Sequence, residues 1–385
     1  MKINFLHITF FIAIIIFGFS FSNKKFSDPN KEKLLIEVVK YVVEKGHYNS
    51  IEIDDDISEK IFDSYIEQLD AQKRFFLQSD IRQFEKYKYK LDDQLKDYDL
   101  TFFDLVFQTS RERIDEVKDY YYDIMENGFD FSSNESIDLD FENKSFARSK
   151  NEIKNRWRKQ LKYSTLDILT LKLGDSIKII DNETLDESMS LIKKNTEDFF
   201  DYISEMDRDD WFANYINAFL NQLDPHTVYF NPDDKDRFDT NISGKFNGIG
   251  ARLQKTEGAV KIVDIIVGGP IWKDKLLDVG DIILKVAQEN EDPVDIIGMK
   301  LDDAIKLIKG PADSVVKLTV KKIDGEIKDV SIKRGLVELE ELYAKSTLIS
   351  KDNKNYGYIS LPKFYVDFSD KNSRNSANDV KNEII

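Results

Sequence analysis

A short glycine-rich turn, Gly248-Ile249-Gly250, runs directly into the alternating stretch at residues 251–254. Glycine lets backbone N–H groups converge because it has no Cβ atom, and converging N–H groups can hold a carboxylate. A strand that follows such a turn can pair with an incoming peptide strand. The same motif also fits an ordinary chain reversal, so the elements after it decide between the two interpretations.

The residues after the turn predict two strands, a helix and a hairpin, in that order. The first two segments are rich in β-branched residues, and the third carries apolar residues on one helical face. Gly310-Pro311 ends the helix, and Asp324-Gly325 favours a tight hairpin turn. The five segments are residues 260–267, 277–286, 301–309, 315–323 and 327–333.

This order of elements resembles a PDZ domain of the permuted kind found in bacterial proteases. Several strings resemble one family in particular, the tail-specific or carboxy-terminal processing serine peptidases. These strings are Gly248-Ile249-Gly250-Ala251, Gly268-Gly269-Pro270, Val279-Gly280-Asp281, Leu301-Asp302-Asp303-Ala304 and Lys309-Gly310-Pro311. Upstream, residues 224–230 resemble the family's Asp-Pro-His-Ser/Thr-x-Tyr-Phe signature. Downstream, residues 357–366 resemble the strand that opens its protease core.

The resemblance implies a groove that captures a protein or peptide C-terminus. The N–H groups of Ile249, Gly250 and Ala251 would hold the terminal carboxylate, and backbone pairing along residues 252–254 would add a strand. Apolar side chains from the turn, the strand and the helix would form a pocket for the last residue, which we expect to be small or apolar. The predicted binding residues are Gly248, Ile249, Gly250, Ala251, Leu253, Leu301, Ile305 and Ile308.

The family's chemistry is peptide-bond hydrolysis by a serine nucleophile with a lysine general base. No serine of this chain lies in a matching context, so no catalytic residue is assigned and the pair is expected beyond Ile385. We therefore expect no peptidase activity from the chain as written, and Ile384-Ile385 to begin a buried strand. Two other interpretations stay open: a non-catalytic PDZ-type tail-binding or adaptor protein, and a helical scaffold whose PDZ-like segment serves assembly.

The composition narrows the range of partners. The formal net charge of −16 argues against nucleic acid, because phosphate binding needs basic patches. The chain has no cysteine and only three histidines, without a His-Glu-x-x-His string, so neither a zinc site nor another cofactor is expected. His226 is expected to be a structural histidine in a turn. The Lys321-Lys322 and Lys333-Arg334 pairs are expected to be charges at strand edges.

Residues 1–22 have the pattern of a signal peptide. Lys2 precedes an apolar run from Phe5 to Phe21, and Ser20 and Ser22 fit the small-residue positions of a cleavage site. An uncleaved membrane anchor is the alternative, since the run approaches the length of a span. Both outcomes predict export to the cell envelope, and cleavage predicts no firm membrane association. Placement in the periplasm, and an adaptor lipoprotein as partner, follow from the resemblance alone.

The predicted fold class is α+β. An all-α helical domain at residues 23–240 precedes a PDZ-like β-rich domain at 241–340 and the opening strand of a protease core at 341–385. The first helix is expected to pack through Leu34, Leu35, Val38, Val39, Val42 and Val43, and the second to begin at Asp56. Further helices are predicted at 81–95, 101–125, 149–173 and 185–206, with a loop at 130–143. The abundant aromatic residues are expected to fill the core.

Overall fold

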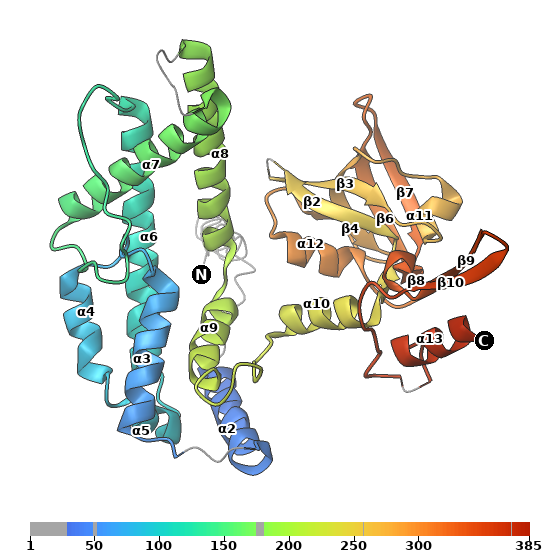
Figure 1. Cartoon of the computed structure of the whole chain (residues 1–385), viewed down its shortest axis with the longest axis horizontal. Helices are drawn as coiled ribbons and strands as arrows, with labels where there is room; N and C mark the ends of the chain where they lie inside the picture. The colour runs from blue at the N-terminus through green and yellow to red at the C-terminus, as the bar shows by residue number, and fades with distance from the viewer. Residues whose placement is uncertain (1–28, 49–51, 175–180, 257, 371) are drawn as a thin grey trace, which may run out of the picture. The chain divides into compact units, whose positions relative to one another are not determined.

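The computed structural model describes residues 29–48, 52–174, 181–256, 258–370 and 372–385 (Figure 1). By its internal contacts the chain divides into two units, Met1–Tyr229 and Phe230–Ile385. The signal peptide predicted at residues 1–22 lies outside the described residues. Of the helices that are described, none is long and apolar enough to cross a membrane.

The described elements of the first unit are all helices. Its helices are α2 (Pro29–Gly46), α3 (Asp55–Asp70), α4 (Gln78–Phe84), η1 (Glu85–Tyr87), α5 (Leu91–Asp97), α6 (Thr101–Asn127), α7 (Lys150–Leu173), α8 (Asn182–Glu205) and α9 (Arg208–Leu220). Short polar side chains define several starts by accepting backbone N–H groups of the first turn. Asp54 caps α3, Ser149 caps α7, Asp181 caps α8 and Asp207 caps α9.

Aromatic side chains form the core of this unit, as predicted. Phe102 on α6 is fully buried, and its ring centroid lies 6.1 Å from that of Tyr65 and 6.2 Å from that of Tyr215. Phe103 stacks on Tyr215 from the other side, with centroids 5.6 Å apart. Three helices distant in sequence, α3, α6 and α9, are thereby joined through one ring cluster.

An ion-pair network ties α2 to the same cluster. Arg208 on α9 donates from Nε and from Nη2 to the two carboxylate oxygens of Glu32, at 2.7 Å each, and from Nη2 to Asp104 at 2.6 Å. Its guanidinium lies 4.8 Å from the centroid of the Phe103 ring. Glu32 is almost completely buried, so its bidentate partner compensates for the loss of hydration.

Three local expectations in this unit were wrong. The helix expected at 81–95 is interrupted between Lys88 and Leu91. The buried Ser58 hydroxyl of α3 donates to the Lys88 carbonyl and accepts the Leu91 N–H, and so replaces the helical hydrogen bonds at this interruption. The second helix is capped by Asp54 and not by Asp56. The face expected on α2 was wrong at Leu34, Val38 and Val42, which are about half exposed. The other three expected residues, Leu35, Val39 and Val43, pack on the core together with Ile36.

The second unit begins with α10 (Pro232–Ser243), before the boundary expected at 240, and continues with a β-rich domain. The main sheet is antiparallel, with strand order β2-β3-β4-β6-β7 and β5 paired to β4; β1 pairs with β8. The elements are β1 (Lys245–Gly248), β2 (Ala251–Thr256), β3 (Ala259–Ile265), α11 (Pro270–Asp274), β4 (Ile282–Gln288), β5 (Val294–Asp295), α12 (Leu301–Ile308), β6 (Val315–Lys321), β7 (Ile327–Lys333), β8 (Gly335–Glu338) and η2 (Glu340–Leu342).

Along the strands of this sheet, side chains that face the core alternate with side chains that face outward. Along β6, Val316, Leu318 and Val320 are buried while their neighbours point outward. The expectation that Lys321 and Lys322 are strand-edge charges was wrong. Lys321 ends β6, which lies between β4 and β7, and Lys322 pairs with the fully buried Asp281 at 2.6 Å and with Asp278 at 2.7 Å. The lysine thus neutralises a carboxylate that burial would otherwise disfavour.

After η2 the chain forms a hairpin of β9 (Lys345–Lys351) and β10 (Lys354–Ser360), and then the helix α13 (Ser376–Ile384). The strand expected at 357–366 therefore ends at Ser360. Ile384-Ile385 does not begin a buried strand, because α13 extends through Ile384 and both side chains are exposed. The polar side chain of Asn375 caps this helix by accepting the Asn378 N–H.

We predict that Phe102→Ala lowers the free energy of unfolding of the helical unit by about 3–5 kcal/mol, because it leaves a cavity among rings that cannot all collapse inward. Tyr122→Ala is the matched control, since Tyr122 is 49% exposed. Its loss should stay within about 0.5 kcal/mol. Denaturant unfolding followed by helical circular dichroism measures both. Equal losses for the two variants would contradict the assignment of Phe102 to the core.

Candidate functional site

One of the two end strands of the main sheet, β2, leaves its outer edge open beside α12. On its inner side β2 pairs with β3, and the sheet order places no described strand on its other side. A groove of about 460 Å³ lies between β2 and α12. Six of the eight predicted residues line this groove: Gly248, Ile249, Ala251, Leu253, Ile305 and Ile308.

The glycine-rich turn closes one end of the groove. The carbonyl of Ile249 accepts the Ile271 N–H at 3.1 Å, and the carbonyl of Gly250 accepts the Ile266 N–H at 2.9 Å. By contrast, the N–H groups of Ile249 and Gly250 donate to no acceptor among the described residues. Two unpartnered backbone donors next to each other are the arrangement that binds an anion.

The backbone of the turn requires glycine at position 250. Its φ is +84°, in the left-handed region that residues with a Cβ rarely adopt. A Cβ atom there would also lie 3.0 Å from the Cα atom of Gly269 and 3.3 Å from Cδ of Pro270. The strings at 248–251 and 268–270 are therefore packed against each other, although β2 and β3 separate them in the sequence.

The remaining predicted residues have other places. Gly250 shapes the turn without lining the groove, and Leu301 packs against the domain core. Ile249 and Ile308 are nearly fully buried and belong both to the core and to the groove wall. Leu253 and Ile305 are partly buried, which leaves their surfaces available to a ligand side chain.

Sequence reasoning missed part of the groove wall. Leu339 and Leu342 line it from the segment around η2, and Phe246 and Ile266 add apolar surface. These residues come from chain segments on either side of the sheet strands that the pattern identified. Nothing in their local sequence indicates a shared groove, since only the pairing of β1 with β8 brings the flanking segments back to β2.

A buried arginine fixes the position of α12. Arg334 is only 3% exposed and donates to the carbonyls of Ile308 at 2.8 Å and Leu307 at 3.0 Å, and to Oε1 of Gln288 at 2.7 Å. Burial lowers the pKa of its guanidinium. The expectation of a strand-edge charge was wrong for this residue. A cation at the last carbonyls of a helix satisfies them and complements the helix dipole.

Charged residues at the groove differ in whether they are paired. Arg237 pairs with Asp302 at 2.6 Å, and Arg252 pairs with Glu341. Lys309 makes no ion pair with a described residue, and its ammonium lies 5.1 Å from the centroid of the Phe246 ring. Burial lowers the pKa of Lys309, with a smaller opposing effect from Asp236 and Asp302. An unpaired, partly desolvated cation beside the turn favours the approach of a carboxylate.

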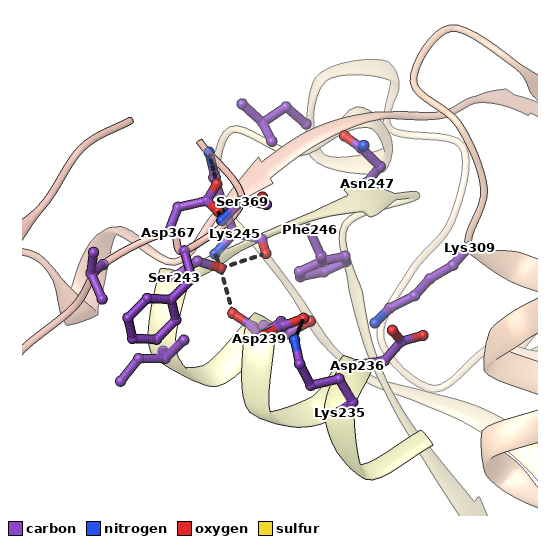
Figure 2. Close-up of a pocket in the computed structure, with 15 residues that line it drawn as sticks. Lys235, Asp236, Asp239, Ser243, Lys245, Phe246, Asn247, Lys309, Asp367 and Ser369 are labelled. Atoms are coloured by element: carbon purple, nitrogen blue, oxygen red, sulfur yellow. Dashed lines mark hydrogen bonds and ion pairs between the residues drawn. The ribbon is translucent and has the colours of Figure 1, made fainter. Parts of the chain in front are cut away.

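A second pocket of about 520 Å³ adjoins the groove, and Phe246 and Lys309 line both (Figure 2). Its far wall is the segment around Asp367, which Lys245 holds at 2.7 Å. Lys245 and the Ser369 hydroxyl keep the pKa of Asp367 well below its usual range. This pocket is the larger of the two, but it has neither an open strand edge nor the unpartnered turn amides. We therefore place the candidate site in the β2–α12 groove.

The Asp-Pro-His-Thr string forms a polar turn in the helical unit. Asp224 accepts the backbone N–H of His226 at 2.7 Å and of Thr227 at 2.9 Å, and its other oxygen lies 2.7 Å from Nε2 of His47. These partners, His47 first, hold the pKa of Asp224 far below its usual range. The His226 side chain is exposed, in keeping with a structural role for the turn. No group of side chains suited to a metal ion occurs within the described ranges.

Comparisons with known proteins agree with the division of the chain into a helical unit and a β-rich unit. The model of the tail-specific protease N-terminal domain matches residues 38–233, and the PDZ domain model matches residues 240–321. The chain is 31% identical over 324 residues to the tail-specific protease of Haemophilus influenzae, covering 84% of this chain and 45% of that protein. It is 32% identical over 165 residues to the carboxy-terminal processing protease CtpA of Bacillus subtilis, covering 43% of this chain and 33% of that protein.

Among solved structures, the chain is similar to the PDZ domain of a carboxy-terminal protease from Vibrio cholerae, which was crystallised with a peptide. The two are 43% identical, the match covers 25% of this chain and 99% of that domain, and the TM-score is 0.24. The fold and the two domain matches define a helical domain followed by the PDZ domain of a C-terminal processing protease. The chain belongs to the tail-specific protease family. It spans less than half the length of the Haemophilus relative.

We predict that Gly250→Ala destabilises the PDZ domain more than Gly268→Ala does. Both positions have a left-handed φ, +84° and +82°, so both variants should lose about 1–2 kcal/mol from backbone strain. Nothing lies within 4 Å of a Cβ at Gly268, whereas at Gly250 it would meet the Gly269 backbone. That contact should add at least about 1 kcal/mol to the loss.

Hydrogen exchange over residues 249–267, read by mass spectrometry, measures the opening free energy of this turn and its strands in both variants. Equal protection in the two variants would show that the close approach of Gly250 to Gly269 does not constrain the domain.

Proposed function

We propose that this chain is the substrate-recognition part of a tail-specific serine endopeptidase, and that the β2–α12 groove binds the free C-terminus of a protein or peptide. The observation that carries the proposal is the pair of unpartnered N–H groups, on Ile249 and Gly250, at the end of an apolar groove beside an open strand edge. Strand addition with capture of a terminal carboxylate uses these three features together.

The groove gives each part of a peptide tail a partner. The terminal carboxylate would accept from Ile249 and Gly250, and the preceding backbone would pair with the open edge of β2. The last side chain would contact Leu253 and Ile305, which are partly buried and apolar. A small or apolar final residue fits these two side chains, because a charged group placed against them would lose hydration.

Lys309 adds a favourable charge on the same side. It has no carboxylate partner among the described residues, and burial already lowers its pKa. A bound carboxylate would stabilise the protonated amine and raise that pKa again. Peptide binding is therefore expected to weaken as pH rises through the pKa of Lys309 in the complex, where its positive charge is lost.

Hydrolysis is proposed for the whole protein, on the strength of its family. The chemistry would be attack on a peptide bond by a serine whose proton passes to a lysine base. We also propose export, supported by the leader pattern at residues 1–22, and placement in the periplasm, which rests on the family resemblance alone. An adaptor lipoprotein as a further partner rests on the family resemblance only.

We predict that a peptide ending in a free alanine or leucine carboxylate binds about 10- to 100-fold more tightly than its C-terminal amide. Amidation removes the charge but leaves one acceptor oxygen, so about one charge-assisted hydrogen bond, which contributes about 1.5–3 kcal/mol, is lost. Fluorescence anisotropy of labelled peptides with the purified chain measures both affinities. If the amide binds as tightly as the acid, carboxylate capture is wrong.

A matched pair of variants locates the binding surface. Ile305→Ala removes apolar contact from the groove and should weaken binding of the free acid by about fivefold. Ile297→Ala is the control, since Ile297 is an exposed isoleucine of the same unit that does not line the groove. A scaffold whose PDZ domain serves assembly alone would bind neither peptide, and an adaptor would bind the acid while the whole protein fails to cleave it.

A further inference from the structure

The helical unit holds a separate cavity of about 320 Å³ that the peptide-binding proposal does not use. It lies between α7, the segment after α3, and the loop that joins α6 to α7. The sequence predicted this loop at residues 130–143, and the structure has no helix or strand there. The cavity's polar residues nevertheless have defined positions, because α7 holds the loop.

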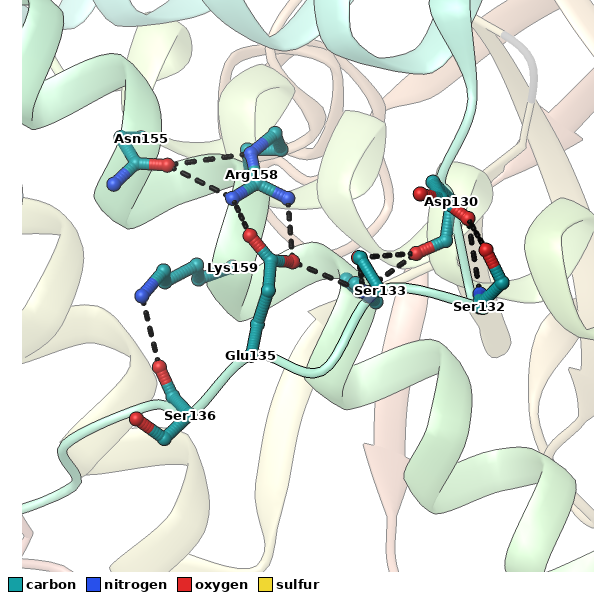
Figure 3. A network of polar contacts seen from close by, with 9 residues as sticks. Asp130, Ser132, Ser133, Glu135, Ser136, Asn155, Arg158 and Lys159 are labelled. Carbon is teal, nitrogen blue, oxygen red and sulfur yellow. Dashed lines mark hydrogen bonds and ion pairs between the residues drawn. The ribbon is translucent and has the colours of Figure 1, made fainter.

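Side chains of α7 fasten the loop at successive turns (Figure 3). Arg158 donates to Glu135 at 2.9 Å, and Lys162 donates to the same carboxylate at 2.9 Å and to the Asp130 carbonyl at 2.6 Å. Arg158 and then Lys162 lower the pKa of Glu135 to about 2. The carboxylate therefore stays ionised at neutral pH, and the loop wall of the cavity stays attached to the helix.

The cavity wall carries more positive than negative charge. Four cations, Arg74, Lys144, Arg156 and Lys159, face two carboxylates, Asp138 and Glu152. Glu152 is already engaged, since it accepts from Arg156 at 2.6 Å and from the Arg148 backbone N–H at 2.9 Å. An excess of two positive charges in a chain with a net charge of −16 is a local departure from its overall electrostatics.

The two lysines are oriented but not neutralised. Lys144 donates to the Asp138 carbonyl at 3.0 Å, and Lys159 donates to the Ser136 carbonyl at 2.9 Å. A carbonyl satisfies one N–H and leaves the charge uncompensated, and neither lysine forms an ion pair with a described residue. Burial lowers the pKa of Lys144, and the charges of Arg156 and Lys159 lower it further.

Arg74 supplies a preoriented guanidinium. It stacks on Trp157, 4.3 Å from the ring centroid, and the Trp157 indole in turn donates to the Arg74 carbonyl at 2.8 Å. Burial lowers the pKa of Arg74 to about 10. The guanidinium makes no ion pair within the described part of the chain. A planar, weakly hydrated guanidinium fixed by an aromatic ring suits bidentate binding of a carboxylate or phosphate.

One buried polar atom of the cavity lining has no partner. Oε1 of Gln72 is buried and has no hydrogen-bond partner in the described structure. Because the two ends of an amide can exchange places, Gln72 can present either an acceptor or an NH₂ donor to a bound group. Unpartnered buried polar groups of this kind are rare without a ligand or an ordered water.

We propose that this cavity is a binding site for a small oxyanion of the phosphate or carboxylate class, held by Arg74, Lys144 and Lys159. The anion would accept from the three cations and relieve their mutual repulsion, so its binding stabilises the helical unit. The site is independent of the β2–α12 groove, which belongs to the other unit.

The first test titrates the purified full chain with inorganic phosphate and, separately, with malonate, at constant ionic strength set by chloride. Calorimetry should detect saturable binding with a Kd of about 1 mM or tighter, and the helical unit should unfold at a higher temperature when the anion is present. Binding of phosphate alone or of malonate alone identifies the oxyanion. Absence of saturable binding for both overturns the proposal.

Variants separate binding from a structural role. Lys144→Gln and Lys159→Gln should each weaken anion binding about tenfold, because each removes a charge-assisted hydrogen bond. Without anion, Lys144→Gln should leave the unfolding midpoint unchanged or higher, since it removes repulsion from Arg156 and Lys159. Lys154→Gln is the control, because Lys154 lies on α7 but pairs with Asp123 outside the cavity. Anion affinity that is unaffected by both cavity variants would overturn the proposal.

Discussion

The β2–α12 groove depends on the hydrogen bonds of the buried Arg334 guanidinium. This guanidinium joins the last carbonyls of α12 to Gln288 at the end of β4, so the helix that forms one wall of the groove is fixed to the sheet. The same side chain requires glycine at position 310, where a Cβ atom would lie 2.9 Å from its Cζ atom. The Gly-Pro pair after α12 thus ends the helix and also makes room for the residue that holds it.

At the other end of the groove, the constraint is steric. A Cβ atom on either Gly250 or Gly269 would lie only 3.0 Å from the Cα atom of the other. The carbonyls of Ile249 and Gly250 accept N–H groups from α11 and its preceding loop. The amide groups of the same two residues remain without partners. Packing between two glycine-rich segments therefore positions the backbone atoms of the proposed carboxylate site, and Lys309, which lines the groove, adds a positive charge.

The local elements of the PDZ domain were predictable because their signals are local. Alternating β-branched residues gave β3 and β6, the apolar face gave α12, and Asp324-Gly325 gave the hairpin between β6 and β7. Six of the eight predicted site residues line the groove for the same reason. What local pattern could not supply were contacts between distant residues, such as Arg334 with Leu307, Lys322 with Asp281, and Ser58 with the break after Lys88. The aromatic core was predicted as a class. The face of α2 was predicted only in part, since Leu35, Val39 and Val43 pack on the core but Leu34, Val38 and Val42 do not.

The most direct test of carboxylate capture is the amide chemical shifts of the isotope-labelled chain as a free-acid peptide is added. The account predicts that the N–H protons of Ile249 and Gly250 move downfield by more than any others, because they gain a charged acceptor. Shifts confined to β9, β10 or the pocket around Asp367, with these two amides unchanged, would contradict it.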